Sequence, residues 1–271
     1  MIHNIPYISE LHIYPIKSCG GISVASAKTS KYGLKYDRQW MIIDKENTFV
    51  TQRNIPSLAL LKPFLDDTYL TITRPDALSE KIEIIQSQQE IITTSVWGDA
   101  INTIDCGNLI ADFLSDYCKQ SVRLVTIGNT YNRPINSGTI SFSAEVGFAD
   151  SYPILLISQS TLDDLNQRLL TPIPMNRFRP NIVISGGIPY QEDSWKKIRT
   201  DTTTLYFGKR CSRCVITTID QNTGVSDGKE PLQTLASYNR DSRGKVMFGS
   251  YWAYQDDDTL LSIGDSVHIL E

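Results

Sequence analysis

The segment "YLTITRPDALSEKIEIIQSQQEIITTSVW" (69–97) decides the fold class, because three short strand patterns follow one another within it. The runs 69–74, 81–87 and 91–97 are β-branched or alternate between apolar and polar residues, and turn-forming or polar residues separate them. The same pattern recurs along the chain, in the runs 10–16, 39–44, 122–127, 181–186, 203–208, 214–220 and 267–270. Many short strands and few helices predict a mainly β fold with a few helices (α+β), rich in β-barrel, rather than a doubly wound sheet.

Three segments break the strand pattern and are predicted to be helices: 107–118, 158–170 and 230–238. The first places its apolar side chains on one helical face, namely Leu109, Ile110, Phe113, Leu114 and Tyr117. In the second, Ser160 and Asp163 are spaced as a capping box ahead of a leucine stripe. Pro231 suits the first turn of the third helix.

The segment 128–147 is polar, rich in Gly, Asn and Ser, and has no strong hydrophobic period, so we expect a loop or a connection between domains. A boundary near residue 122 then divides the chain into a β-barrel-like N-terminal domain, 1–122, and a second domain, 123–271. The second domain contains a pair of closely spaced cysteines, in "KRCSRCVITTID" (209–220).

Composition indicates an ordinary globular protein: 271 residues, 41% hydrophobic and 21% charged, with a net charge of −4. A chain of this length buries a sizeable core without a metal or disulfide staple. No basic surface points to nucleic acid, and the longest apolar run, 152–158, is far too short to span a membrane. Five scattered cysteines fit a reducing compartment, so we expect a cytoplasmic protein.

The cysteine pair, Cys211 and Cys214, admits several roles. Zinc is disfavoured because a structural site needs four ligands, and the chain has no second pair and only His3, His12 and His268. A dithiol pair usually opens a helix, whereas the β-branched run after Cys214 favours a strand.

Two interpretations of the pair stay open. Both cysteines could be small residues in a buried strand. Alternatively, the adjacent cations, Lys209, Arg210 and Arg213, lower a thiol pKa toward the thiolate that a soft metal ion such as molybdenum or copper binds.

Beyond these local patterns, the chain resembles the MOSC-domain proteins of the amidoxime-reducing type over nearly its whole length. The resemblance rests on several segments in family order: "LHIYPIKSCGG" (11–21), "GLKYDRQWMIID" (33–44), "FVTQRNIPSLALL" (49–61), "FADSYPILLISQSTLDDLN" (148–166), "NRFRPNIVISG" (176–186), "YQEDSWKKI" (190–198), "CSRCVITTIDQNTGVSDGKEPLQTLASY" (211–238) and "FGSYW" (248–252). It implies a MOSC N-terminal β-barrel-like domain followed by an irregular MOSC β-barrel. It also implies a molybdenum cofactor, a pterin carrying molybdenum.

The resemblance further implies the residues of the site. Cys214 is the position of the metal ligand, and Cys211 is then a neighbour without assigned chemistry. Positions that contact the cofactor in the family correspond to Lys17, Ser18, Arg38, Asp150, Ser151, Arg179, Asn181, Arg213 and Tyr251. Asp150 and Tyr251 are also titratable candidates for moving protons near the metal. The plainer alternatives are a paired surface charge for Arg38 and a core side chain for Tyr251.

The activity that the resemblance implies is the two-electron reduction of N-hydroxylated compounds: amidoximes, hydroxylamines and N-hydroxylated bases. Because the sequence has no plant-type ferredoxin cysteine cluster, a separate electron donor, a ferredoxin or a flavoprotein, is expected. An alternative function is a non-catalytic carrier that holds the cofactor, or a sulfur on Cys214. The third possibility is a structural barrel with incidental cysteines.

Overall fold

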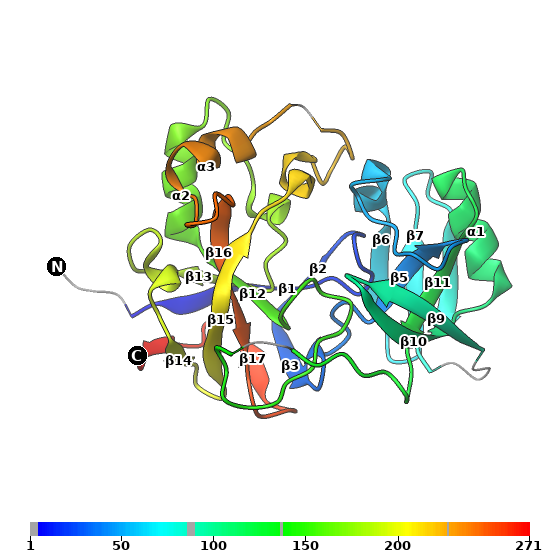
Figure 1. The fold of residues 1–271 in the computed structure, drawn as a ribbon, viewed down its shortest axis with the longest axis horizontal. Coiled ribbons are helices and arrows are strands. Elements are labelled where there is room, and N and C mark those ends of the chain that lie inside the picture. Colours follow the sequence, from blue (N-terminus) through cyan, green and yellow to red (C-terminus); the bar gives the residue numbers. More distant parts are fainter. Residues whose placement is uncertain (1–4, 86–89, 136–137, 227) are drawn as a thin grey trace.

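The computed structural model describes residues 5–85, 90–135, 138–226 and 228–271, and strands dominate it (Figure 1). The expected mainly β fold with a few helices is therefore confirmed. The strands form two lobes, one built on an eight-stranded sheet and one on two smaller sheets. No helix in the described ranges combines the length and the apolar character that a bilayer crossing requires.

The larger lobe is organised by the eight-stranded sheet, in which β12 and β13 run parallel and the other pairs antiparallel. In spatial order its strands are β18 (His268–Ile269), β14 (Lys197–Arg199), β15 (Thr204–Ser212), β16 (Met247–Ala253), β12 (Ile154–Ser158), β13 (Ile182–Ser185), β1 (Tyr7–Ile13) and β2 (Ile22–Val24). A second, three-stranded sheet orders β17 (Leu260–Ser262), β3 (Ser26–Ser30) and β4 (Gly33–Leu34). Backbone bonds from the segment after β17 to β1 curl the sheet into an irregular barrel.

The smaller lobe, on the right in Figure 1, packs two sheets and one helix around a shared core. Its sheets order β5 (Trp40–Asp44), β11 (Val122–Ile127), β10 (Asp99–Asp105) and β9 (Ile91–Val96), and then β6 (Lys62–Leu65), β7 (Tyr69–Thr73) and β8 (Ser79–Glu83). The helix α1 (Asn108–Cys118) buries Ile110 and Leu114 against this core. The opening 69–97 segment thus supplies β7, β8 and β9.

The chain crosses between the lobes more than once. Two of the first four strands pair with strands from the C-terminal half, β1 with β13 and β3 with β17, whereas β11 pairs with β5 and β10 of the smaller lobe. The division of the sequence at residue 122 stays a prediction, and the sheets draw strands from both sides of it.

Helices α2 (Gln159–Arg168) and α3 (Leu232–Tyr238) lie on the larger lobe, close to their predicted ranges. The predicted capping box was wrong: the N-cap of α2 is Ser158, whose Oγ accepts a hydrogen bond from the Thr161 backbone N–H at 3.2 Å. In α1, Leu109 does not share the buried face, because its side chain is 78% exposed.

The predicted strand at 214–220 was also wrong, because residues Val215–Thr218 form a short 3-10 helix, η4. The threonines explain the difference: the Thr217 hydroxyl donates to the Cys214 carbonyl, and the Thr218 hydroxyl donates to the Val215 carbonyl. Such local bonds offer the backbone an alternative to a sheet ladder. The other 3-10 helices described are η1 (Pro56–Leu60), η2 (Met175–Arg177) and η3 (Gln191–Asp193).

The remaining strand predictions differ from the structure mainly at their ends. The run 10–16 is shifted, since β1 begins at Tyr7 and ends at Ile13. The run 81–87 corresponds to β8, which ends at Glu83. Residues 86 and 87 of the predicted run lie outside the described ranges. Within the described part of 128–147 there is no named helix or strand, as expected of a connection.

Candidate functional site

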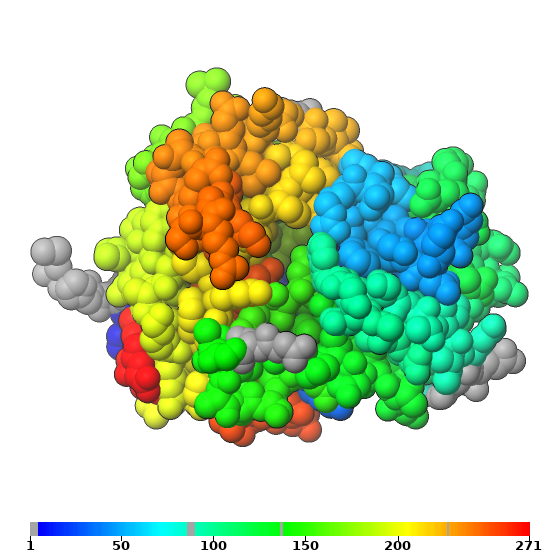
Figure 2. Space-filling model, in the orientation of Figure 1, coloured from blue at the N-terminus to red at the C-terminus, as the bar shows by residue number. Residues whose placement is uncertain are grey.

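One pocket at the junction of the two lobes brings together nine of the ten predicted site residues, and Figure 2 shows the surface hollowed there. These nine are Lys17, Ser18, Arg38, Asp150, Arg179, Asn181, Arg213, Cys214 and Tyr251. The empty space of the pocket, including the part that is open to solvent, is about 760 Å³. Ser151 does not line it, because its side chain sits in the bend that follows Asp150.

The two cysteines of the pair occupy different environments. Cys211 lies on β15 and is 2% exposed, whereas Cys214 follows the strand as an exposed residue of the pocket. Both are free thiols. Both cysteines line the pocket, and Cys214 is the one whose side chain is exposed.

The cations next to the pair in sequence separate in space. Arg213 Nη1 donates to Cys211 Sγ at 3.0 Å, and its Nη2 donates to the Phe178 carbonyl at 2.6 Å. Arg210 turns away and pairs with Asp193, with 2.7 Å between Nε and Oδ2. Of the cations adjacent to the cysteines in sequence, only Arg213 lines the pocket.

Arg38 ties three segments together beneath the pocket. Its Nη1 donates to both oxygens of Asp37 at 2.9 and 2.7 Å and to Asn181 Oδ1 at 2.9 Å, and its Nη2 donates to the Arg179 carbonyl at 3.1 Å. The Asn181 amide in turn donates to the His12 carbonyl. Most of the hydrogen-bonding groups of Arg38 and Asn181 are already bonded to other protein atoms. These two side chains therefore fix the shape of the pocket wall.

Arg179 keeps most of its donors free. Its guanidinium stacks on the Tyr14 ring at 4.3 Å, and its one side-chain bond within the described residues is to Gln221 Oε1 at 3.3 Å. Burial without a carboxylate partner lowers its pKa to about 10. Ser18, Arg38 and Arg179 all adopt positive φ, a conformation that is uncommon for residues other than glycine and that concentrates at functional sites.

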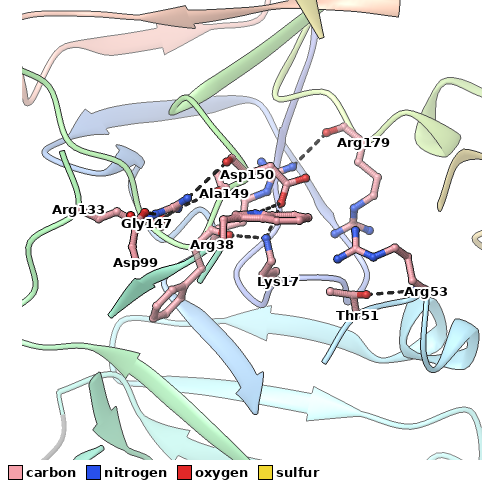
Figure 3. A network of polar contacts seen from close by, with 12 residues as sticks. Lys17, Arg38, Thr51, Arg53, Asp99, Arg133, Gly147, Ala149, Asp150 and Arg179 are labelled. Atoms are coloured by element: carbon pink, nitrogen blue, oxygen red, sulfur yellow. Dashed lines mark hydrogen bonds and ion pairs between the residues drawn. The ribbon is translucent and has the colours of Figure 1, made fainter. Parts of the chain in front are cut away.

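Lys17 and Asp150 form the ion pair at the centre of the network in Figure 3. Lys17 Nζ is buried and donates to Asp150 Oδ1 at 2.6 Å and to the Phe148 carbonyl at 2.8 Å. Burial lowers the pKa of Lys17, and Asp150 opposes that effect. Burial also opposes ionisation of Asp150, but the Lys17 ammonium, the Trp97 indole N–H and the Arg38 charge together hold its pKa well below the usual value.

Tyr251 on β16 stacks on Tyr152 with 5.9 Å between ring centroids and an interplanar angle of 17°. Burial raises the pKa of its phenol well above the ordinary value, and the nearby Cys211 and Asp150 add to this rise. Tyr251 therefore keeps its proton at neutral pH.

Sequence reasoning missed the residues that position the 147–150 bend. Arg133 is 5% exposed, and its Nη1 donates to the Gly147 carbonyl at 2.8 Å and to the Ala149 carbonyl at 2.6 Å (Figure 3). Its Nε lies 3.3 Å from Asp99 Oδ2 in the smaller lobe. Because Arg133 lies in the polar 128–147 segment, nothing in the local sequence pattern marks it.

Two further missed residues stand at the pocket rim. Arg53 lines the pocket from the smaller lobe, and Trp97, at the turn between β9 and β10, donates from Nε1 to Asp150 Oδ1 at 3.3 Å. Arg53 lies within the family-like segment 49–61, which was the available signal for it.

A reciprocal pair of side-chain amides, one buried and one partly buried, joins the lobes near the pocket. Gln52 Nε2 donates to Gln221 Oε1 at 3.1 Å, and Gln221 Nε2 donates back to Gln52 Oε1 at 3.0 Å. Gln52 is fully buried and also donates to the Ser18 carbonyl at 2.7 Å. The segment after Cys214 is thereby fastened to the opposite wall.

Comparison with known proteins gives the family. The family model described as "MOSC N-terminal beta barrel domain" matches residues 5–121, and the family model described as "MOSC domain" matches residues 143–268. The chain is 36% identical to mitochondrial amidoxime-reducing component 1 of Mus musculus over 99% of this chain and 84% of that protein. It is 33% identical to the Homo sapiens protein of the same name, over 100% of this chain and 85% of that one.

A third relative is much longer than this chain. The molybdenum cofactor sulfurase of Oryza sativa subsp. japonica is 32% identical over 92% of this chain but only 33% of its own length.

Proposed function

The chain belongs to the MOSC family, with a MOSC N-terminal β-barrel domain followed by a MOSC domain, and from that premise we propose that it binds a molybdenum pterin cofactor and reduces N-hydroxylated compounds. The relatives named for amidoxime reduction, which match nearly the whole chain, support this reaction class. The observation that carries the proposal is the single exposed thiol, Cys214, in a pocket lined by several cations.

The donor set of the pocket fits such a cofactor. A molybdenum pterin brings two dithiolene sulfurs of its own, so the protein needs to add only one soft ligand, and a thiolate is soft. Cys214, an exposed thiol of the pocket lining, is the proposed ligand. Arg179, with its free N–H groups, and the Ser18 hydroxyl suit the phosphate of the pterin. Arg38 and Asn181 would hold this wall in shape.

The reaction consumes two electrons and two protons: the N–O bond breaks, an N–H bond forms and the oxygen leaves as water. When bound, the cofactor supplies the two-electron chemistry. The residues of this chain handle the protons. Lys17 is the proposed proton donor, because burial lowers its pKa while the ionised Asp150 keeps it charged at neutral pH. Tyr251 keeps its phenol proton and can donate a hydrogen bond into the pocket.

Electrons would come from a separate protein donor of the ferredoxin or flavoprotein class. The exposed position of Cys214 supports this, because a donor that docks on the larger lobe could approach the metal closely.

The test combines metal analysis with an assay. Protein from a host that makes the cofactor should contain molybdenum and pterin and should reduce benzamidoxime with an artificial electron donor. Cys214→Ala should lose molybdenum and turnover together. Cys118→Ala, which removes a buried thiol of the smaller lobe, is the matched control and should keep both.

Two outcomes would redirect the proposal. Full molybdenum in Cys214→Ala would remove the ligand assignment. Bound molybdenum without turnover of any N-hydroxylated compound would favour a carrier of cofactor or of sulfur.

A further inference from the structure

Arg53 differs from the other cations of the pocket in that its guanidinium has no hydrogen-bond or ion-pair partner among the described residues, although its backbone N–H donates to the Thr51 hydroxyl. Lys17, Arg38 and Arg213 each donate side-chain hydrogen bonds to the protein, and Arg179 donates one to Gln221. For the Arg53 guanidinium, no hydrogen bond or ion pair joins it to any other described residue. Its N–H groups are therefore available to a molecule that enters the pocket.

Two aromatic rings hold Arg53 in place. Its guanidinium carbon lies 5.1 Å from the Trp97 ring centroid and 5.9 Å from the Phe49 centroid, and the two rings contact each other at 5.2 Å. Stacking on an aromatic face leaves the planar edge of a guanidinium, with its fork of donors, free to bind a carboxylate or a phosphate. An ordinary solvated arginine has no such support.

Trp97 occupies a strained position to provide this support. Val96 and Asp99 pair across a two-residue turn in which Trp97 has a φ of +54° and Gly98 has a φ of +93°. Turns of this kind favour Asn-Gly, because a bulky side chain is strained at positive φ. Nevertheless Trp97 is 52% exposed there, whereas Trp40, Trp195 and Trp252 are buried. Strain of this kind concentrates at ligand sites.

Charge favours an anionic ligand at the same place. The pocket lining contains Lys17, Arg38, Arg53, Arg179 and Arg213 but, of the acidic residues, only Asp150. Asp150 is neutralised by Lys17, and Arg38 is neutralised by Asp37 just outside the lining. This positive lining stands out on a chain whose net charge is −4, and it would attract negatively charged molecules.

We propose that Arg53, supported by Trp97, binds an oxyanion carried by the substrate, so that the protein prefers N-hydroxylated substrates bearing a carboxylate or a phosphate group. This inference rests on the proposed function. Arg53 belongs to the smaller lobe and Cys214 to the larger one, so a substrate that contacts Arg53 is held from the wall opposite the thiol-bearing segment.

The experiment compares two substrates that differ only in the anion, benzamidoxime and 4-carboxybenzamidoxime, with cofactor-loaded protein. The measured quantity is the preference ratio, kcat/KM for the carboxylate substrate divided by kcat/KM for the neutral one. Arg53→Gln should lower this ratio about tenfold, which is the loss expected for one charge-assisted contact. Arg199→Gln, which removes the same charge from an exposed position on β14, is the matched control and should leave the ratio unchanged. With the unmutated protein, added KCl should lower the ratio by screening.

Several results would overturn the inference. An unchanged ratio in Arg53→Gln, or an equal fall with both substrates, would show that Arg53 does not recognise the anion. Loss of molybdenum or pterin from Arg53→Gln would assign Arg53 to the phosphate of the cofactor instead.

If neither amidoxime is reduced by the unmutated protein, the proposed function fails. The contact between Arg53 and the anion is then tested by a binding measurement, which does not depend on turnover. Binding is then measured by the change in tryptophan fluorescence, to which the exposed Trp97 contributes, as each compound is titrated into the protein. Arg53→Gln should bind 4-carboxybenzamidoxime about tenfold more weakly than the unmutated protein does. Equal binding by the two proteins would contradict the inference.

Discussion

The charge of Asp150 is set by residues from three separate parts of the chain. Lys17 follows β1, Trp97 caps the β9–β10 hairpin, and Arg133 fixes the backbone of the bend from the connecting segment. The Asp150 side chain is 49% exposed, so solvent also reaches the pair. Lys17 is only 7% exposed, so Asp150 compensates a buried charge and thereby controls the proton affinity of Lys17.

Asp150→Asn should therefore move the alkaline limb of the pH–rate profile to lower pH. Burial lowers the pKa of Lys17 and the Asp150 charge opposes this, so an amide leaves the effect of burial unopposed and the ammonium loses its proton at lower pH. We also expect a fall of about a hundredfold in kcat/KM at neutral pH, the size typical of a disturbed proton donor. The measurement is kcat/KM for benzamidoxime across pH. Asp256→Asn, an exposed acid outside the pocket, is the control.

An Asp150→Asn protein with full activity and an unchanged pH profile would remove both residues from proton transfer. If Asp150→Asn keeps its activity but its alkaline limb shifts to lower pH, Lys17 remains the proton donor. Asp150 then acts only through the effect of its charge on the pKa of Lys17.

Among the elements, α2 shows that both the local sequence and the tertiary structure decide where a helix begins. The spacing of Ser160 and Asp163 fits a capping box, yet Ser158, the last residue of β12, caps the helix. Burial decides between them, since Ser158 is 2% exposed and its backbone N–H also donates to the buried Glu192.

Ser158→Ala should lower the free energy of unfolding by about 1–2 kcal/mol, the usual cost of losing an N-cap that accepts a backbone N–H. Ser160→Ala should cost less than about 0.5 kcal/mol, as a change outside the cap does. Urea unfolding of the two variants measures the difference. The opposite ranking would restore the capping box that the sequence suggests.

The sequence predicted elements better than contacts. Periodicity located all three α-helices and nine of the eighteen strands of the described chain, because alternation and helical spacing are local properties, but it missed the other nine strands, among them β10, β12 and β16. It failed at 215–218, where threonine side chains bond their own backbone. Resemblance to the family identified the site residues, but the contact of Trp97 with Asp150 depends on how a hairpin of one lobe meets a bend of the other. No local pattern encodes that meeting.

At the scale of the whole molecule, polar contacts between the lobes determine the shape of the pocket. The Gln52–Gln221 amide pair is reciprocal, with Gln52 fully buried and Gln221 partly buried, and it connects the wall that holds Ser18 with the segment that follows Cys214. Removal of either amide breaks both bonds of the pair, although Gln52 keeps its bond to the Ser18 carbonyl and Gln221 keeps its bonds with Arg179 and the Ile219 carbonyl.

A double-mutant cycle of Gln52→Ala and Gln221→Ala should therefore show a coupling free energy of about 1 kcal/mol or more, with the double variant less destabilised than the sum of the single ones. Urea unfolding of the four proteins gives the value. Gln159→Ala on α2 replaces Gln221→Ala in the control cycle, and its effect should add to that of Gln52→Ala. Additivity in the first cycle would mean that the pair does not link the lobes energetically.

The position of β1 between β13 and β2 has a consequence for biosynthesis. Tyr7–Ile13 is synthesised before Ile182–Ser185, against which it pairs and which follows about 170 residues later. At typical rates of translation that interval is roughly ten to thirty seconds. For this time an apolar strand waits without its partner, exposed to chaperones and to other nascent chains. The eight-stranded sheet of the larger lobe therefore cannot be completed until β13 to β18 have been made, even though β1 precedes them by so many residues.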